Sequence, residues 1–166
     1  MANVKLLIRL FVFVMFTLSR GLAQERIYNF LHFTSREGLP SDKIRDAAVD
    51  EKGLVWITTG KGLCYFDGNT FFPVSFTQNS DFSYDLGNLS IGSNNKIWVA
   101  SYNRGLISYD RSKPQHEAWT SYSAKAAYGD VEKHELYAVH ESGGKVFFGG
   151  QETDLQILDP VSGRIS

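Results

Sequence analysis

Two stretches of the chain repeat one pattern, Leu54–Asp67 (LVWITTGKGLCYFD) and Lys96–Asp110 (KIWVASYNRGLISYD). Each consists of an alternating apolar run, a turn that contains glycine, and a second apolar run that ends in an aromatic residue followed by aspartate. A weaker third copy lies at Lys145–Asp159 (KVFFGGQETDLQILD), and the closing aspartates are 43 and 49 residues apart. A period of this length is the span of one four-stranded sheet, so the pattern predicts a tandem array of such sheets.

Three residue types recur at fixed positions of the copies: an aromatic residue in the first apolar run, a leucine at the start of the second run, and an aspartate after it. One four-stranded sheet cannot bury both of its faces alone, so we expect the aromatic residues and leucines to pack against neighbouring sheets. Each aspartate can accept hydrogen bonds from turn amides. We interpret all of these positions as structural: Trp56, Trp98 and Phe147; Leu63, Leu106 and Leu155; and Asp67, Asp110 and Asp159.

Each copy is predicted to be an antiparallel meander of strands in an all-β chain. The dipeptide Asp67-Gly68 between two apolar runs is a strong signal for a tight hairpin turn. The third copy is expected to end at Ser166 before a fourth strand forms. The predicted strands are Ile44–Asp50, Leu54–Gly60, Gly62–Asp67 and Thr70–Phe76, then Leu86–Gly92, Lys96–Ser101, Gly105–Arg111 and His116–Tyr122, then Glu135–Glu141, Lys145–Gly150 and Asp154–Asp159.

Residues 1–23 have the pattern of a signal peptide. Lys5 and Arg9 form a basic start, Leu10–Leu18 is a mostly apolar run, and Gly21 and Ala23 are small residues before an expected cleavage site. The alternative is an uncleaved anchor, but the apolar run is much shorter than the ~20 residues needed to cross a bilayer. We therefore expect an exported protein, located in the periplasm if the source is bacterial.

Composition excludes several classes of function. After the leader the chain has 14 basic and 18 acidic residues, and this net charge of −4 argues against nucleic-acid binding. The single cysteine, Cys64, cannot form an internal disulfide. The four histidines do not have the spacing of metal ligands, and no glycine-rich phosphate loop precedes a helix. The sequence therefore predicts no catalytic residue, no metal and no cofactor.

Two turns between the apolar runs are candidates for ligand binding. They are one residue longer than the corresponding turn of the first copy, and they carry polar and aromatic side chains. Because they project from the same side of successive sheets, they would line a common rim; the alternative is that they are ordinary surface turns. The candidate residues are Tyr102, Asn103, Arg104, Gln151, Glu152 and Thr153.

The first copy closely resembles the two-component regulator propeller repeat. The matching residues are Glu37–Ser41 (EGLPS), Ile44, Val49-Asp50, Lys52-Gly53, Val55–Thr59 (VWITT), Lys61–Leu63 (KGL) and Tyr65–Gly68 (YFDG). The resemblance covers roughly residues 28–160 and is weakest in the third copy. It implies a β-propeller built from four-stranded blades, of the kind found in the periplasmic sensor region of hybrid two-component and histidine-kinase-type regulators of Bacteroidetes-like bacteria.

This resemblance implies a function. The chain would be a non-catalytic sensor segment that binds a small molecule or an oligosaccharide, anchored at the inner membrane, and that signals to a cytoplasmic histidine kinase encoded downstream. The alternative is an exported propeller that stands alone, either as a binding module or as an enzyme such as a lyase or hydrolase.

The expected domain layout is an incomplete ring of about three blades. Propellers typically close with four to eight blades, so we expect an N-terminal fragment whose partners are further blades of the same chain. The alternative is that several copies assemble, as in a homodimer. The expected segments are a signal peptide at 1–23, an outer strand that closes the ring at 24–34 (strand Tyr28–Thr34), blade 1 at 35–76, blade 2 at 77–122 and a truncated blade 3 at 123–166.

Overall fold

The computed structural model describes residues 29–76, 85–122, 125–126, 129–130, 135–151 and 153–166, together with residues 3, 4, 9 and 11. The chain divides into two compact units, Met1–His32 and Phe33–Ser166. Most of the expected signal peptide and residues 24–28 of the expected outer strand lie outside the described residues. None of the helices in the described residues has the length and apolar character of a membrane span.

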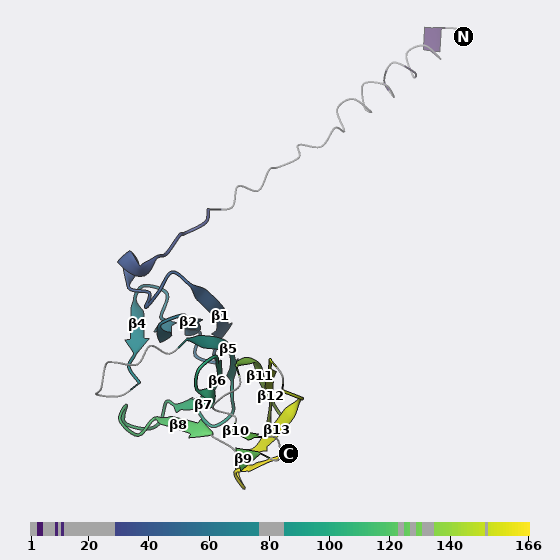
Figure 1. Ribbon diagram of the computed structural model, residues 1–166. Helices are drawn as coiled ribbons and strands as arrows, with labels where there is room; N and C mark the ends of the chain where they lie inside the picture. The colour runs from purple at the N-terminus through teal and green to yellow at the C-terminus, as the bar shows by residue number, and fades with distance from the viewer. Residues whose placement is uncertain are drawn as a thin grey trace. The chain divides into compact units, whose positions relative to one another are not determined.

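Among the described residues, most of the second unit consists of three four-stranded antiparallel sheets, and the strands of each of these sheets follow chain order (Figure 1). This confirms the prediction of an all-β fold with an incomplete set of about three propeller blades. Blade 1 consists of β1 (Ile44–Val49), β2 (Val55–Thr59), β3 (Gly62–Phe66) and β4 (Phe71–Val74); blade 2 of β5 (Leu86–Ile91), β6 (Lys96–Ser101), β7 (Gly105–Asp110) and β8 (Trp119–Tyr122); and blade 3 of β11 (Leu136–Ser142), β12 (Lys145–Gly150), β13 (Gln156–Asp159) and β14 (Arg164–Ile165).

The expectation that the third copy ends before a fourth strand is wrong. The chain reverses at Gly163, whose φ of 70° lies in the left-handed region that favours glycine, and β14 then pairs with β13. Two backbone hydrogen bonds of 2.9 and 3.0 Å between Ile157 and Ser166 continue this pairing. The sequence also did not predict the short hairpin of β9 (Lys125–Ala126) and β10 (Gly129–Asp130) between blades 2 and 3.

The segment before blade 1 forms no strand with any other part of the chain that the structure describes. Residues 29–34 are irregular, and η1 (Ser35–Glu37) is a single turn of 3₁₀ helix that Thr34 caps. The ring of Phe33 lies 5.3 Å from the rings of both Phe66 and Phe71 of blade 1. The strand expected to close a ring therefore stays a prediction, because the blade it would join is not among the described residues.

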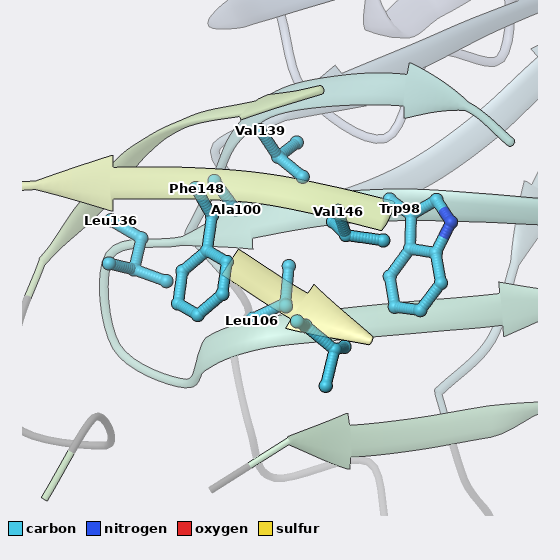
Figure 2. Packing of buried hydrophobic residues seen from close by; sticks show 8 residues of the cluster. Trp98, Ala100, Leu106, Leu136, Val139, Val146 and Phe148 are labelled. Atoms are coloured by element: carbon cyan, nitrogen blue, oxygen red, sulfur yellow. The ribbon is translucent and has the colours of Figure 1, made fainter. Parts of the chain in front are cut away.

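The recurring tryptophan of each of the first two blades is buried against the blade that follows it. Trp56 is 2% exposed and packs with Leu63 of its own blade and with Leu86 and Ile97 of blade 2. Trp98 is fully buried and packs with residues of blade 3. Figure 2 shows this second cluster, with Trp98 at one end and Leu136 at the other. Burial of these large apolar side chains is the main source of stability at each junction.

Blade 3 buries only one face. Val146, Phe148 and Leu158 point toward blade 2 and are at most 1% exposed. Neighbouring side chains on a strand alternate between the two faces. Phe147 is accordingly half-buried, and Leu155, in the position equivalent to the buried Leu63 and Leu106, is 70% exposed. Within the described residues, no blade covers this second face of blade 3.

A buried carboxylate fixes the junction between blades 1 and 2. Asp50 accepts hydrogen bonds from the indole Nε1 of Trp56 (2.9 Å) and from the amides of Lys52 (2.9 Å) and Leu54 (3.0 Å). It also pairs with the guanidinium of Arg111 from blade 2. Burial opposes ionisation of this carboxyl, but the indole and backbone hydrogen bonds and the charge of Arg111 hold its pKa below the ordinary value.

The junction between blades 2 and 3 keeps the tryptophan–carboxylate contact but takes the carboxylate from the next blade. The indole of Trp98 donates to Glu141 of β11, which also accepts from the amide of Ser93 (2.9 Å) and from its hydroxyl. Gly92 occupies the repeat position of Asp50. A Cβ atom at Gly92 would collide with Glu141 Oε2 and with the indole of Trp98, so only glycine leaves room for this contact.

Two leucines of blade 3 offer a matched test of this packing. Leu158→Ala should lower the free energy of unfolding of the chain by about 2–5 kcal/mol, because it opens a cavity against blade 2. Leu155→Ala should lower it by less than about 0.5 kcal/mol, because the side chain is mostly exposed. Urea unfolding followed by tryptophan fluorescence measures both values; equal losses would contradict the assignment of the two faces.

The lowered pKa of Asp50 predicts how the stability of the folded chain depends on pH. Its pKa is lower in the folded chain than in the unfolded chain, so its stabilising contribution is complete well above the unfolded pKa of about 3.9 and is lost as the pH falls through the lower folded value. Asp50→Asn should cost about 2 kcal/mol at pH 7, and the difference from wild type should shrink below about pH 4. Glu51→Gln on the adjacent turn is the charge control. A difference that stays constant from pH 7 to pH 3 would rule out this role.

Candidate functional site

One end of every blade carries both the turn between the second and third strands and the start of the first strand. In each blade, a backbone hydrogen bond of 3.0 Å connects this turn to the residue that directly precedes the first strand. We call this end the turn face. The bonds run from Gly60 to Lys43 in blade 1, from Tyr102 to Asp85 in blade 2 and from Gln151 to Glu135 in blade 3.

A β-bulge interrupts the first strand of each blade at the same place, close to the turn face. The register skips Arg45 in β1, Gly87 and Asn88 in β5, and Tyr137 in β11. A bulge leaves a residue outside the ladder and re-aims its side chain, which is why bulges recur beside functional sites. The bulges therefore direct Arg45 and Tyr137 out of the regular packing of their strands.

The bulge residue of blade 2 is glycine, and its neighbours explain why. A Cβ atom at Gly87 would lie 3.2 Å from the carbonyl oxygen of Leu136 and 3.4 Å from Cε2 of Tyr102. The missing side chain lets the backbone of blade 3 and the ring of Tyr102 both lie close to Gly87. Gly87 also accepts a 2.7 Å hydrogen bond from the hydroxyl of Thr58, which connects it to blade 1.

Side chains from all three described blades meet beside these bulges, at the turn face. Nη2 of Arg45 lies 2.9 and 3.1 Å from the two carboxylate oxygens of Asp85, and its guanidinium carbon lies 4.6 Å from the centre of the Tyr102 ring. The ring of Tyr102 lies 5.2 Å from that of Tyr137, tilted by 50°. An ion pair, a cation–π contact and an aromatic contact thus run from blade 1 through blade 2 to blade 3.

The chain of contacts continues through a hydroxyl group. The Tyr137 oxygen lies 2.7 Å from Oε2 of Glu135 and 2.7 Å from Oε1 of Gln151. The hydrogen bond to the Glu135 carboxylate is the main reason that the pKa of Tyr137 is raised. We name the whole group the rim cluster: Arg45, Asp85, Tyr102, Glu135, Tyr137 and Gln151.

The structure brings together two of the predicted ligand-binding residues, Tyr102 and Gln151. Tyr137 bridges Tyr102 and Gln151. Asn103 and Thr153 instead stabilise their own turns: Asn103 Oδ1 accepts a 3.0 Å hydrogen bond from Ser101, and Thr153 Oγ1 accepts one of 2.7 Å from the Gly150 amide. Arg104 is half-buried in the same turn as Tyr102, and Glu152 lies outside the described residues.

Sequence reasoning missed Arg45, Asp85, Glu135 and Tyr137. It considered the turns of the turn face but not the first-strand residues that lie beside them. Aligning the first strands would have found the signal, because Arg45, Gly87 and Tyr137 occupy one repeat position and Asp85 and Glu135 another.

The chemistry of the rim cluster suits non-covalent binding of a polar ligand. Two partly buried tyrosine rings offer apolar faces, and carboxylate, amide and guanidinium groups offer directed hydrogen bonds. No group of His, Cys, Asp and Glu among the described residues is arranged to hold a metal ion. Burial raises the pKa of the Cys64 thiol to about 11, so this thiol packs as an apolar group with Leu39 and Phe71.

No protein-family model matches the sequence, and no curated protein matches it significantly. Solved structures do match. The extracellular domain described as that of the hybrid two-component system BT3049 from B. thetaiotaomicron gives a TM-score of 0.67 at 18% identity, over 82% of this chain and 19% of that chain. The corresponding domain of BT4673 from the same organism gives 0.64 at 13% identity, over 77% and 18%.

An enzyme has a comparable fold. Virginiamycin B lyase from Staphylococcus aureus gives a TM-score of 0.57 at 13% identity, over 75% of this chain and 41% of the lyase. The chain spans about a fifth of the length of the two extracellular domains. At these identities the likeness shows the fold alone: the chain folds as part of a β-propeller of the kind found in extracellular domains of two-component systems, as its repeat predicted.

Proposed function

We propose that the chain is the ligand-sensing, extracytoplasmic part of a two-component regulator and is itself non-catalytic. The observation that carries the proposal is the rim cluster, in which bulged first strands direct side chains of three successive blades into one contact network. The likeness to extracellular domains of two-component systems supports it. The regulator would be exported to the periplasm, held at the inner membrane, and coupled to a cytoplasmic histidine kinase encoded beyond this chain.

The position of the rim cluster fits a sensing role. The cluster crosses both junctions between blades, through the Arg45–Asp85 pair and through the Tyr102–Tyr137 contact. A ligand that replaces or tightens these contacts would favour one arrangement of the blades over another. It would shift that equilibrium only by the difference between its affinities for the two arrangements.

The residue types of the cluster favour a hydroxylated ligand, either a small molecule or an oligosaccharide. The tyrosine rings would pack against the C–H faces of a sugar ring, the carboxylates of Asp85 and Glu135 would accept hydrogen bonds from hydroxyl groups, and the Gln151 amide would do both. Such a mixture of apolar faces and a few directed polar groups is typical of small-ligand sites.

A second candidate function is that of a stand-alone exported propeller, either a binding module or an enzyme. The fold similarity to virginiamycin B lyase favours this candidate. The downstream reading frame discriminates between the two: a membrane span followed by kinase motifs supports the sensor, and a stop codon soon after closure of the ring supports the stand-alone protein.

Substitutions in the turn that carries Tyr102 test the sensing role. In the full-length protein, Tyr102→Ala should raise the ligand concentration for half-maximal signalling by about tenfold, because it removes an aromatic ring of the rim cluster. We propose the same effect for Arg104→Ala, whose side chain belongs to the same turn. The ligand is first found by a thermal-shift screen of oligosaccharides, and signalling is read as kinase autophosphorylation. Phe72→Ala, on the outermost strand of blade 1, is the aromatic control. Normal responses of both variants with an intact fold would remove the proposal.

We further propose that more blades of the same chain cover the second face of blade 3, and a cysteine probe tests this. Leu155→Cys should react rapidly with a thiol reagent in the 166-residue chain and at least about tenfold more slowly in a protein extended by its downstream sequence. Val161→Cys, at a position that is 96% exposed, is the control that should react in both. The native Cys64 is buried and gives no background. Equal reactivity of Leu155→Cys in both proteins would contradict a covering blade.

A further inference from the structure

An arginine fills the junction between blades 1 and 2 at the end of the blades opposite the turn face. Arg111 follows β7, and its guanidinium pairs with the buried Asp50. Its Nε donates a 3.2 Å hydrogen bond to the carbonyl of Asn95, and its guanidinium carbon lies 5.7 Å from the centre of the Trp56 ring. Indole, carboxylate and guanidinium therefore form one compact group at this junction.

At the junction between blades 2 and 3, a proline occupies the repeat position that Arg111 occupies at the junction between blades 1 and 2. Arg111 follows the closing Asp110 of blade 2, and Pro160 follows the closing Asp159 of blade 3. Pro160 has no charged group to place in the junction. The structure has a cleft of about 420 Å³ there, lined by Pro160, Val161, Trp98 and Glu141. This volume is within the range of roughly 300–1,000 Å³ that is usual for small-ligand sites.

The junction between blades 2 and 3 does have an indole and a carboxylate that correspond to those of the first junction. Glu141 accepts the indole hydrogen bond of Trp98, as Asp50 accepts that of Trp56. Among the described residues, no basic nitrogen lies within ion-pair distance of the Glu141 carboxylate. The cleft therefore contains the tryptophan–carboxylate pair without the guanidinium.

The other charges that line the cleft offset each other. Lys96 lies opposite Asp110 across β6 and β7, and its ammonium is 5.5 Å from the centre of the Trp98 ring. Asp110 accepts hydrogen bonds from Ser112, and the charges of Lys113, which does not line the cleft, and of Lys96 add to their stabilisation of its carboxylate. With this pair neutral overall, the charge of Glu141 leaves the cleft net negative.

We propose that the cleft between blades 2 and 3 binds the guanidinium group of a ligand, which pairs with Glu141 as Arg111 pairs with Asp50. The ligand is either a free small molecule or an arginine side chain presented by a peptide. Carboxylates bind guanidinium through charge-assisted hydrogen bonds of fixed geometry, so an alkylammonium of similar length should bind less well. This site is at the opposite end of the blades from the rim cluster and does not depend on the sensing role.

Isothermal titration of the intact protein with agmatine tests the proposal. Agmatine should bind, and 1,4-diaminobutane should bind more weakly because it lacks the guanidinium. Glu141→Gln should weaken agmatine binding at least about tenfold. Glu117→Gln removes the same charge at an exposed position elsewhere in blade 2 and should leave the binding unchanged. The absence of agmatine binding, or equal affinity in wild type and Glu141→Gln, would overturn the proposal.

A second variant keeps the test valid if Glu141→Gln fails to fold, because Glu141 also holds Trp98. Pro160→Arg supplies a guanidinium from the chain itself, as at the first junction, and should abolish agmatine binding while raising the melting temperature. Unchanged agmatine binding in a folded Pro160→Arg protein would overturn the proposal. Blocked arginine, with an acetylated amine and an amidated carboxyl group, distinguishes the sources: binding comparable to agmatine identifies a peptide side chain, and much weaker binding identifies a free ligand.

Discussion

The structure depends on one constraint: a four-stranded blade has two apolar faces and can bury them only against other blades. Trp56 and Trp98 meet this constraint at the two junctions among the described residues, where each large ring packs against the first strand of the following blade. A buried indole also has an N–H group that needs an acceptor, and Asp50 and Glu141 provide one. The polar contacts at the junctions thus follow from the choice of tryptophan as the residue that fills them.

The same junctions place the candidate functional groups. At the turn face, bulges in the first strands bring Arg45 and Tyr137 to the two sides of Tyr102. At the opposite end, the first junction contains Arg111 where the second contains Pro160. Repetition of a blade supplies the scaffold, and departures from the repeat supply the places where a ligand has room to bind.

The sequence predicted much of the fold because strand alternation and turn residues recur with the period of a blade. The closing Asp67 and the glycine after it are sufficient to locate a hairpin. The strand β14 was missed because two residues carry no alternating pattern. The rim cluster was found only in part. Tyr102 lies in a turn that the aligned second and third strands reveal, whereas the position shared by Arg45 and Tyr137 appears only when the first strands are aligned as well. At the second junction, Gly92 replaces Asp50 and the indole acceptor is Glu141 of the next blade. The sequence did not reveal this replacement, because it depends on how blades 2 and 3 pack together.

Hydrogen exchange of the three indole N–H groups measures this packing most directly. Those of Trp56 and Trp98 donate to carboxylates inside the junctions, whereas that of Trp119 donates to the Ser75 carbonyl at an exposed site. If blade-on-blade burial holds the fold together, the first two should exchange only when the whole unit unfolds, and Trp119 should exchange much faster. Exchange of Trp56 and Trp98 at the rate of Trp119 in the folded chain would contradict the account.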